Sequence, residues 1–274
     1  MLKTLLSATF VSLFYLTAFC QTDTLASSNY FRKGYDKQIV KDYKSALKLY
    51  DSAAIANPAY DKVYLYRGLV KYYLQDLTGS IEDYTRFIAH NPQSAMAFDN
   101  RGYSKYLLGD DMGALEDYNT SATLDPYVSR AYFNRGAVEN RLLQYKEAIA
   151  DFNKALSLNP NNADIYFNLG ISKGASDDYA GAIEAFDNAI RLRPNFAQAF
   201  LYRGTNKSLL KDYKGADDDL SHCIALSPKN SDAYLSRGAM RLDNNDKDGA
   251  CADFNKALLL GNKQAAKIIK ENCN

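Results

Sequence analysis

The sequence has 274 residues, of which 47% are hydrophobic and 24% are charged, with 15 glycines and six prolines. This composition supplies enough apolar side chains for a large folded body and excludes a disordered chain. Because 33 Lys and Arg residues are balanced by 32 Asp and Glu residues, the net charge of +1 gives no broad positive field for nucleic acid or for anionic lipid, and we expect neither partner.

Residues 1–20 have the pattern of a signal peptide. An early lysine precedes an apolar run, and Ala18 and Cys20 occupy the small-residue positions before Gln21. We therefore expect a secreted or periplasmic protein that is cleaved near Cys20–Gln21. Two alternatives stay open: a retained membrane anchor, for which the apolar run is short, and a lipoprotein, against which bulky Phe19 argues. After Gln21 no apolar run is long enough to span a bilayer.

After the leader, the sequence repeats every 34 residues without an insertion. When the recurring glycine is counted as position 8, the repeats are about 27–60, 61–94, 95–128, 129–162, 163–196, 197–230 and 231–262. Position 4 is always aromatic, position 20 is Ala or Ser, position 24 is Tyr, Phe or Leu, and all six prolines fall at position 32. Such self-similarity at a fixed period is typical of a repeat protein.

Spacing within each repeat predicts two antiparallel helices. Positions 4 and 8 lie one turn apart on one face of the first helix, and positions 20 and 24 do the same on the second. Turn-forming clusters such as "LGDDMG" separate the two helices, and Pro at position 32 ends the second. Because one hairpin cannot bury its apolar face alone, we predict an all-α solenoid over residues 21–274.

An Arg-Gly pair recurs at positions 7 and 8, and we expect it to be structural. Five repeats have Arg at position 7 and Asp at position 23, whereas repeats with Leu169 or Lys33 at position 7 lack that Asp. A half-buried guanidinium needs a carboxylate, so we predict charge-assisted hydrogen bonds within a repeat or to an adjacent one. The expected pairs are Arg67 with Asp83, Arg101 with Asp117, Arg135 with Asp151, Arg203 with Asp219 and Arg237 with Asp253. The alternative is a groove of arginines for an anionic ligand.

A second, weaker pattern couples Lys at position 11 to Asp at position 16, as in Lys105 and Asp110. We expect exposed ion pairs at the end of the first helix, although the Asp could equally cap the next helix. The fourth repeat departs from the pattern, with Glu139 and Gln144 at these positions.

At the C-terminal end, residues 263–273 predict an amphipathic helix that caps the open end of the solenoid. If the chain turns back near Gly261, Cys251 lies about as far before the turn as Cys273 lies after it. We therefore predict a disulfide between these two residues in an oxidising compartment. Cys223 occupies a position for small buried residues, and we expect a free thiol there.

No combination of side chains indicates catalysis. His90 and His222 lie in different repeats without Cys or His at ligand spacing, and the sequence contains no P-loop, dinucleotide-binding turn or nucleophile elbow. We expect no enzyme activity, no cofactor and no metal site.

The 34-residue pattern resembles the tetratricopeptide repeat (TPR), most closely in residues 163–196, and the resemblance covers about residues 27–262. It implies a right-handed α-solenoid of seven helix-turn-helix units plus the C-terminal cap. In this family the first helices line a concave groove, and their positions 2, 5, 6, 9, 12 and 13 face a bound peptide. The groove residues that this implies are Tyr66, Tyr72, Asn100, Tyr103, Tyr106, Arg130, Phe133, Asn134, Phe167, Asn168 and Tyr202.

The resemblance thus implies a non-catalytic scaffold that binds a peptide or a partner protein. Rings and side-chain amides offer apolar contact and hydrogen bonds to an extended chain. The alternatives are that the same tyrosines stack on a small molecule or glycan, or that some rings only pack neighbouring repeats. The Lys and Asn residues with which some family members clamp a carboxyl terminus are missing at positions 5 and 9. The sequence indicates neither the partner's identity nor the oligomeric state.

Overall fold

The computed structural model describes residues 24–273, and none of these residues forms a β-strand. Backbone contacts divide the chain between Tyr127 and Val128 into two compact parts. We call them the N-terminal unit (residues 24–127) and the C-terminal unit (residues 128–273) and describe each by itself. No helix in the described range is long and apolar enough to cross a membrane. The signal peptide expected at residues 1–20 lies outside the described residues.

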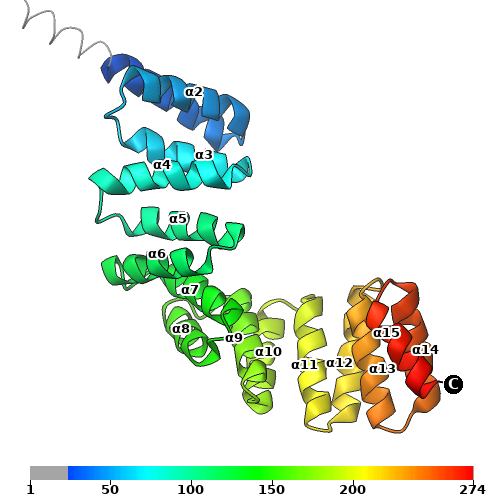
Figure 1. Ribbon diagram of the computed structural model, residues 1–274. Coiled ribbons are helices and arrows are strands. Elements are labelled where there is room, and N and C mark those ends of the chain that lie inside the picture. The colour runs from blue at the N-terminus through cyan, green and yellow to red at the C-terminus, as the bar shows by residue number, and fades with distance from the viewer. Residues whose placement is uncertain (1–23, 274) are drawn as a thin grey trace, which may run out of the picture. The chain divides into compact units, whose positions relative to one another are not determined.

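The N-terminal unit contains the helices of the first three repeats (Figure 1). Residues 24–39 are helical, and they are followed by α2 (Tyr43–Ala56), α3 (Lys62–Tyr73), α4 (Leu77–His90), α5 (Ala95–Leu108) and α6 (Asp111–Leu124). Each helix from α3 to α5 packs against the helix before it and the helix after it, so the hairpins stack in chain order.

The C-terminal unit contains four further hairpins and one final helix. Its helices are α7 (Ser129–Arg141), α8 (Tyr145–Leu158), α9 (Ala163–Ala175), α10 (Tyr179–Leu192), α11 (Ala197–Leu209), α12 (Tyr213–Leu226), α13 (Ser231–Asp243), α14 (Lys247–Leu259) and α15 (Lys263–Asn272). The first helices of successive repeats also contact one another, α7 with α9, α9 with α11 and α11 with α13. This is the all-α solenoid that the repeat pattern predicts.

The recurring glycine is explained by the ring at position 24. A Cβ atom added to Gly170 would lie 2.6 Å from Cε1 of Phe186, and one added to Gly136 would lie 2.9 Å from Cε1 of Phe152. Both rings are completely buried, as is the alanine at position 20 beside them in each repeat. The glycine is therefore needed for close packing of the two helices, because a ring occupies the space of a side chain.

The turn between the two helices of a hairpin has a constant geometry. The residue at position 15 has a left-handed backbone conformation, with φ between 60° and 66° at six non-glycine residues and 83° at Gly109. In six of the seven repeats the Asp that follows at position 16 accepts a hydrogen bond from a backbone N–H of the first helical turn. Of the two hypotheses for this Asp, helix capping is thus observed.

Candidate functional site

The arginines at position 7 lie half-buried, and each makes two parallel hydrogen bonds to the Asp at position 23 of its own repeat. Nε and Nη2 of Arg101 donate to the carboxylate of Asp117 at 2.9 and 2.7 Å. The same geometry joins the other four pairs, Arg67 with Asp83, Arg135 with Asp151, Arg203 with Asp219 and Arg237 with Asp253. Each guanidinium is already paired with a buried carboxylate. This pairing argues against the alternative hypothesis that the arginines line a groove for an anionic ligand.

Four of these arginines also reach the preceding repeat. Nη1 donates to the side chain at position 25 of that repeat, in the pairs Arg67 with Asp51, Arg101 with Thr85, Arg203 with Asp187 and Arg237 with Ser221. These acceptors were not predicted from the sequence. A signal was present, because position 25 carries a side-chain oxygen in every repeat: Asp51, Thr85, Asn119, Asn153, Asp187, Ser221 and Asn255. Each of these four arginines therefore joins three helices.

The predicted pairing of position 11 with position 16 is wrong for Lys71, Lys105 and Lys207, whereas Arg241 lies 3.9 Å from Asp246 as predicted. In these four repeats the cation at position 11 contacts the buried Asp at position 23, in the pairs Lys71 with Asp83 (3.0 Å), Lys105 with Asp117 (2.9 Å), Lys207 with Asp219 (2.8 Å) and Arg241 with Asp253 (2.8 Å). A buried carboxylate attracts a cation more strongly than an exposed one, which water screens. In the two repeats that lack this Asp, Lys37 and Lys173 lie 3.8 Å from Asp42 and Asp178.

The predicted groove residues of the N-terminal unit fall into two environments. Tyr66 is half-buried and packs edge-on against Phe31, with ring centroids 5.2 Å apart, so it links the first two repeats. Tyr72 and Tyr106 are also half-buried and Tyr103 is 36% exposed, but these three rings contact one another instead of Phe31. Asn100 is half-buried one helical turn before Tyr103 on α5.

A connected set of rings, which we call the tyrosine cluster, comprises Tyr43, Tyr72, Tyr73, Tyr103 and Tyr106. Tyr43 stacks on Tyr73 with centroids 4.6 Å apart, Tyr72 contacts Tyr73 and Tyr103 at 5.2 and 5.6 Å, and Tyr103 lies 6.4 Å from Tyr106. Burial and the neighbouring Tyr103 raise the pKa of Tyr72, so its hydroxyl stays protonated at neutral pH. Tyr43, at the start of a second helix, was not among the expected site residues.

In the C-terminal unit, the expected groove rings mainly cover the core. Phe167 lies 4.7 Å from Phe196 and 5.8 Å from Phe186, and Phe133 lies 6.1 Å from Phe152. Tyr202 packs against Phe167 and keeps 41% of its surface exposed.

The polar groove residues of this unit lie on the same first helices. The side-chain amide of Asn168 donates to the carbonyl of Asp164 on α9 at 2.8 Å. Asn134 is half-buried on α7, and Arg130 is exposed at the start of that helix. Among the predicted groove residues, the structure brings Phe167 and Tyr202 into contact in this unit and Tyr72, Tyr103 and Tyr106 in the N-terminal unit.

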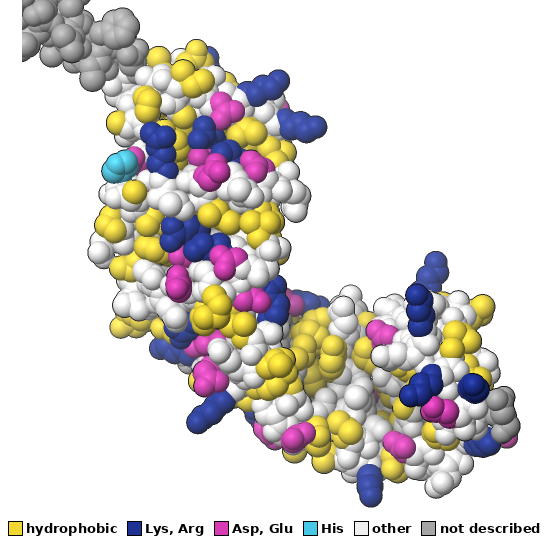
Figure 2. Space-filling view, in the orientation of Figure 1, with side chains coloured by type: hydrophobic (Ala, Val, Ile, Leu, Met, Phe, Trp, Pro, Cys, Tyr) yellow, Lys and Arg dark blue, Asp and Glu magenta, His cyan; other side chains and the backbone are white. Residues whose placement is uncertain are grey.

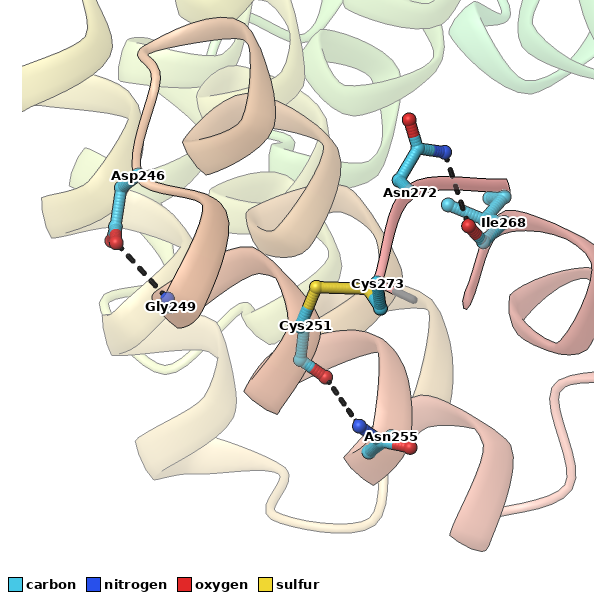
Figure 3. Close-up of a disulfide and its surroundings, with 7 residues drawn as sticks. All are labelled: Asp246, Gly249, Cys251, Asn255, Ile268, Asn272 and Cys273. Atoms are coloured by element: carbon cyan, nitrogen blue, oxygen red, sulfur yellow. Dashed lines mark hydrogen bonds between the residues drawn. A yellow bond between two sulfur atoms is a disulfide. The ribbon is translucent and has the colours of Figure 1, made fainter. Parts of the chain in front are cut away.

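The C-terminal end is closed by a disulfide and a short helix. Cys251 on α14 is bonded to Cys273, which directly follows α15, with the two Cα atoms 5.7 Å apart (Figure 3). Ala265 on α15 is completely buried. Cys223 is a free, buried cysteine, and burial raises the pKa of its thiol.

Charged side chains of both signs are interspersed on the surface. Figure 2 shows Lys and Arg side chains beside Asp and Glu side chains over the visible face of the N-terminal unit, with hydrophobic side chains between them. Within residues 24–273, no three His, Cys, Asp or Glu side chains are placed to hold a metal ion together.

Comparisons with known families point to the same repeat. Residues 144–174 match a family model described as a TPR repeat, and residues 167–205 match one described as a tetratricopeptide repeat. No curated protein sequence matches the chain.

Several solved structures share the fold. A tetratricopeptide repeat protein from Parabacteroides merdae ATCC 43184 is 23% identical, with a TM-score of 0.67 over 91% of this chain and 100% of that one. YrrB, described as a TPR protein with an unusual peptide-binding site, is 22% identical, with a TM-score of 0.59 over 69% of this chain and 97% of that one. For Pseudomonas aeruginosa pilF the identity is 18% and the TM-score is 0.67, over 81% and 99% of the two chains. The family-model matches show tetratricopeptide repeats within residues 144–205, and these structures show the same fold of stacked hairpins.

Proposed function

We propose that this protein is an exported, non-catalytic scaffold that binds a peptide or a partner protein along the first helices of its repeats. TPR solenoids are protein-interaction modules, since stacked repeats create an extended binding surface. The peptide-binding site named for YrrB supports a peptide as the ligand class. Export rests on the leader-like pattern of residues 1–20.

The observation that carries the proposal is the tyrosine cluster. Tyr73 and Tyr103 are 47% and 36% exposed although they contact other rings, so their positions are fixed before a ligand arrives. A tyrosine offers a large apolar area together with a hydroxyl and has only two side-chain torsions to restrict, which is why tyrosines are enriched at interfaces. Asn100, one turn before Tyr103, adds a side-chain amide of the kind that extended peptides need.

The test is a screen of the leaderless chain against a displayed library of extended peptides, followed by titration of the best ligand. We expect Tyr103→Ala to weaken binding at least about tenfold, the effect of a central aromatic contact. Tyr127→Ala is the matched control, because Tyr127 is 80% exposed in the turn after α6, outside the tyrosine cluster. Full binding by a folded Tyr72→Ala/Tyr103→Ala variant would move the site away from this cluster.

A small molecule or a glycan is the second candidate ligand. The parallel stack of Tyr43 on Tyr73, with ring planes only 7° apart, favours it because flat aromatic faces stack on sugar rings. A glycan array probed with the unchanged chain and with Tyr73→Ala separates the two hypotheses. If the unchanged chain binds glycans but no peptide, and Tyr73→Ala loses that binding, the glycan is favoured.

Export is tested separately. We expect the mature chain in the periplasmic or secreted fraction, with an amino terminus at or near Gln21 in the intact mass. A full-length mass in a membrane fraction would instead favour the retained anchor.

A further inference from the structure

The fourth repeat breaks an electrostatic rule that four other repeats obey. In those repeats the Asp at position 23 contacts two cations, an Arg from position 7 and a Lys or Arg from position 11. In the fourth repeat position 11 is Glu139, so a carboxyl group stands where an ammonium or guanidinium is found elsewhere. The neighbouring Glu147 also replaces the glycine found at position 19 in five repeats.

The two acidic side chains are buried together. Glu139 is 8% exposed and Asp151 is 6% exposed. Both oxygens of Asp151 accept hydrogen bonds from Arg135, at 2.6 and 2.7 Å. The Oε2 atom of Glu139 is buried and has no hydrogen-bond partner among the described residues. Two carboxyl groups that are buried close together cannot both be ionised without strong repulsion.

The charged groups of the C-terminal unit that face Glu139 do not neutralise the pair. Arg135 on α7 is positive, while Asp151 and Glu147 on α8 are negative. From α9, Ser172 donates to Asn140 at 2.7 Å, and Lys173 is directed to Asp178 at 3.8 Å. One guanidinium therefore faces three carboxyl groups, whereas the matching group in the third repeat has two cations for Asp117.

We propose that Glu139 and Asp151 hold one proton between them near neutral pH, in the place where other repeats hold a lysine or arginine, and that its loss loosens the α7–α8 hairpin. Burial raises the pKa of Glu139 from 4.5 to about 7, and the charge of Asp151 adds to the shift while Arg135 opposes it. The folded chain thus keeps a proton that the unfolded chain has lost. This contribution to stability is fully present below about pH 4.5 and is lost as the pH rises through about 7.

Two measurements on the full chain test the proposal. The first follows the ¹³Cδ signals of labelled glutamates by NMR between pH 4 and 9, with Glu139→Gln used to assign the signal of Glu139. The second follows urea unfolding at pH 5.5, 7 and 8.5 for the unchanged chain, Glu139→Gln and Glu139→Lys. Glu116→Gln, which removes an exposed carboxyl group on α6, is the matched control.

We expect the Glu139 signal to titrate near pH 7. Relative to Glu139→Gln, the folding equilibrium constant of the unchanged chain should fall by up to about tenfold per pH unit as the pH rises towards 7. Glu139→Lys should be more stable than the unchanged chain at pH 8.5, and Glu116→Gln should keep its pH dependence.

Two outcomes would overturn the proposal. One is titration of Glu139 near pH 4.5, which is decisive even if the Lys variant does not fold. The other is a result at pH 8.5 in which calcium chloride or sodium chloride stabilises the unchanged chain more than choline chloride does, while Glu139→Gln shows no such difference between the salts. That result would mean that the carboxyl pair binds a metal cation instead of a proton.

Discussion

The N-terminal and C-terminal units are built from the same hairpin but differ in the rings that they use. At position 24 the N-terminal unit has Tyr50, Tyr84 and Tyr118, whereas the C-terminal unit has Phe152, Phe186, Leu220 and Phe254, all of them buried. At positions 12 and 13 of the first helices, the N-terminal unit has Tyr72, Tyr73 and Tyr106. The C-terminal unit has residues such as Asn140, Gly174 and Ala175 at these positions. The hairpin therefore needs close packing of the glycine against a large side chain at position 24, but not a particular ring there.

The two units also differ in how they neutralise the buried Asp at position 23. In the N-terminal unit both Asp83 and Asp117 contact an Arg and a Lys. In the C-terminal unit Asp151 faces Glu139, and position 23 of the next repeat is Ala185. Every buried Asp at position 23 of the N-terminal unit therefore has two cations, whereas in the C-terminal unit Asp151 faces a carboxyl group.

The largest expected effect compares the same arginine in the two units. At pH 8, we expect Arg135→Ala to cost about 3–5 kcal/mol of unfolding free energy, because Asp151 would stay buried beside ionised Glu139. Arg101→Ala should cost less, about 1–3 kcal/mol, because Lys105 remains 2.9 Å from Asp117. Urea unfolding followed by circular dichroism measures both.

A double-mutant cycle on Arg101 and Asp117 is the control for this comparison. If the two side chains interact, the loss in the double alanine variant is smaller than the sum of the single losses. Additive losses of unfolding free energy in this cycle would contradict the pairing. Equal losses for Arg101→Ala and Arg135→Ala would show that the residue at position 11 does not change the cost of removing the arginine.

The next effect is confined to the C-terminal unit. The disulfide closes a loop with a sequence separation of 22 residues, and its removal in Cys251→Ser/Cys273→Ser should cost about 3 kcal/mol on the chain-entropy account. Thermal unfolding with and without reductant measures the loss, and the double variant should no longer respond to reductant. Three alkylated thiols in the native, unreduced mature chain would show that the bond is absent.

The smallest effect compares two glycines. A Cβ at Gly170 would lie 2.6 Å from the Phe186 ring, whereas a Cβ at Gly68 would lie 3.2 Å from the Tyr84 ring. Gly170→Ala should therefore cost about 1–3 kcal/mol through overpacking. Gly68→Ala should lie within about 1 kcal/mol of the unchanged chain, because the higher helix propensity of alanine offsets a milder contact. Equal thermal midpoints for the two variants would contradict the difference in packing.

The sequence was sufficient for the fold because every hairpin repeats the same constraint. Glycine at position 8 and a large side chain at position 24 recur in phase seven times. A wrong prediction of the helix bounds in one repeat is therefore corrected by the other repeats. The joint change of positions 7 and 23 likewise pointed to partners that lie 2.6 to 2.9 Å apart in the structure.

The candidate site was harder to predict because it depends on contacts between repeats. The stack of Tyr43 on Tyr73 joins a second helix of one repeat to a first helix of the next, which a pattern within one repeat does not reveal. Phe167 has the same position as a groove residue but is placed over the core rings. The partner of Lys105 was misjudged because sequence spacing does not show that Asp117 is buried and Asp110 is exposed.

The arginine bridges have a direction, and this direction matters while the chain is being made. In the pairs of Arg67 with Asp51, Arg101 with Thr85 and Arg237 with Ser221, the donor always comes later in the sequence than the acceptor. Since a polypeptide leaves the ribosome amino terminus first, the hairpin that supplies the acceptor is complete before the arginine emerges. Within each unit, growth of the solenoid can therefore follow the order of translation, each new hairpin docking on a template that is already folded.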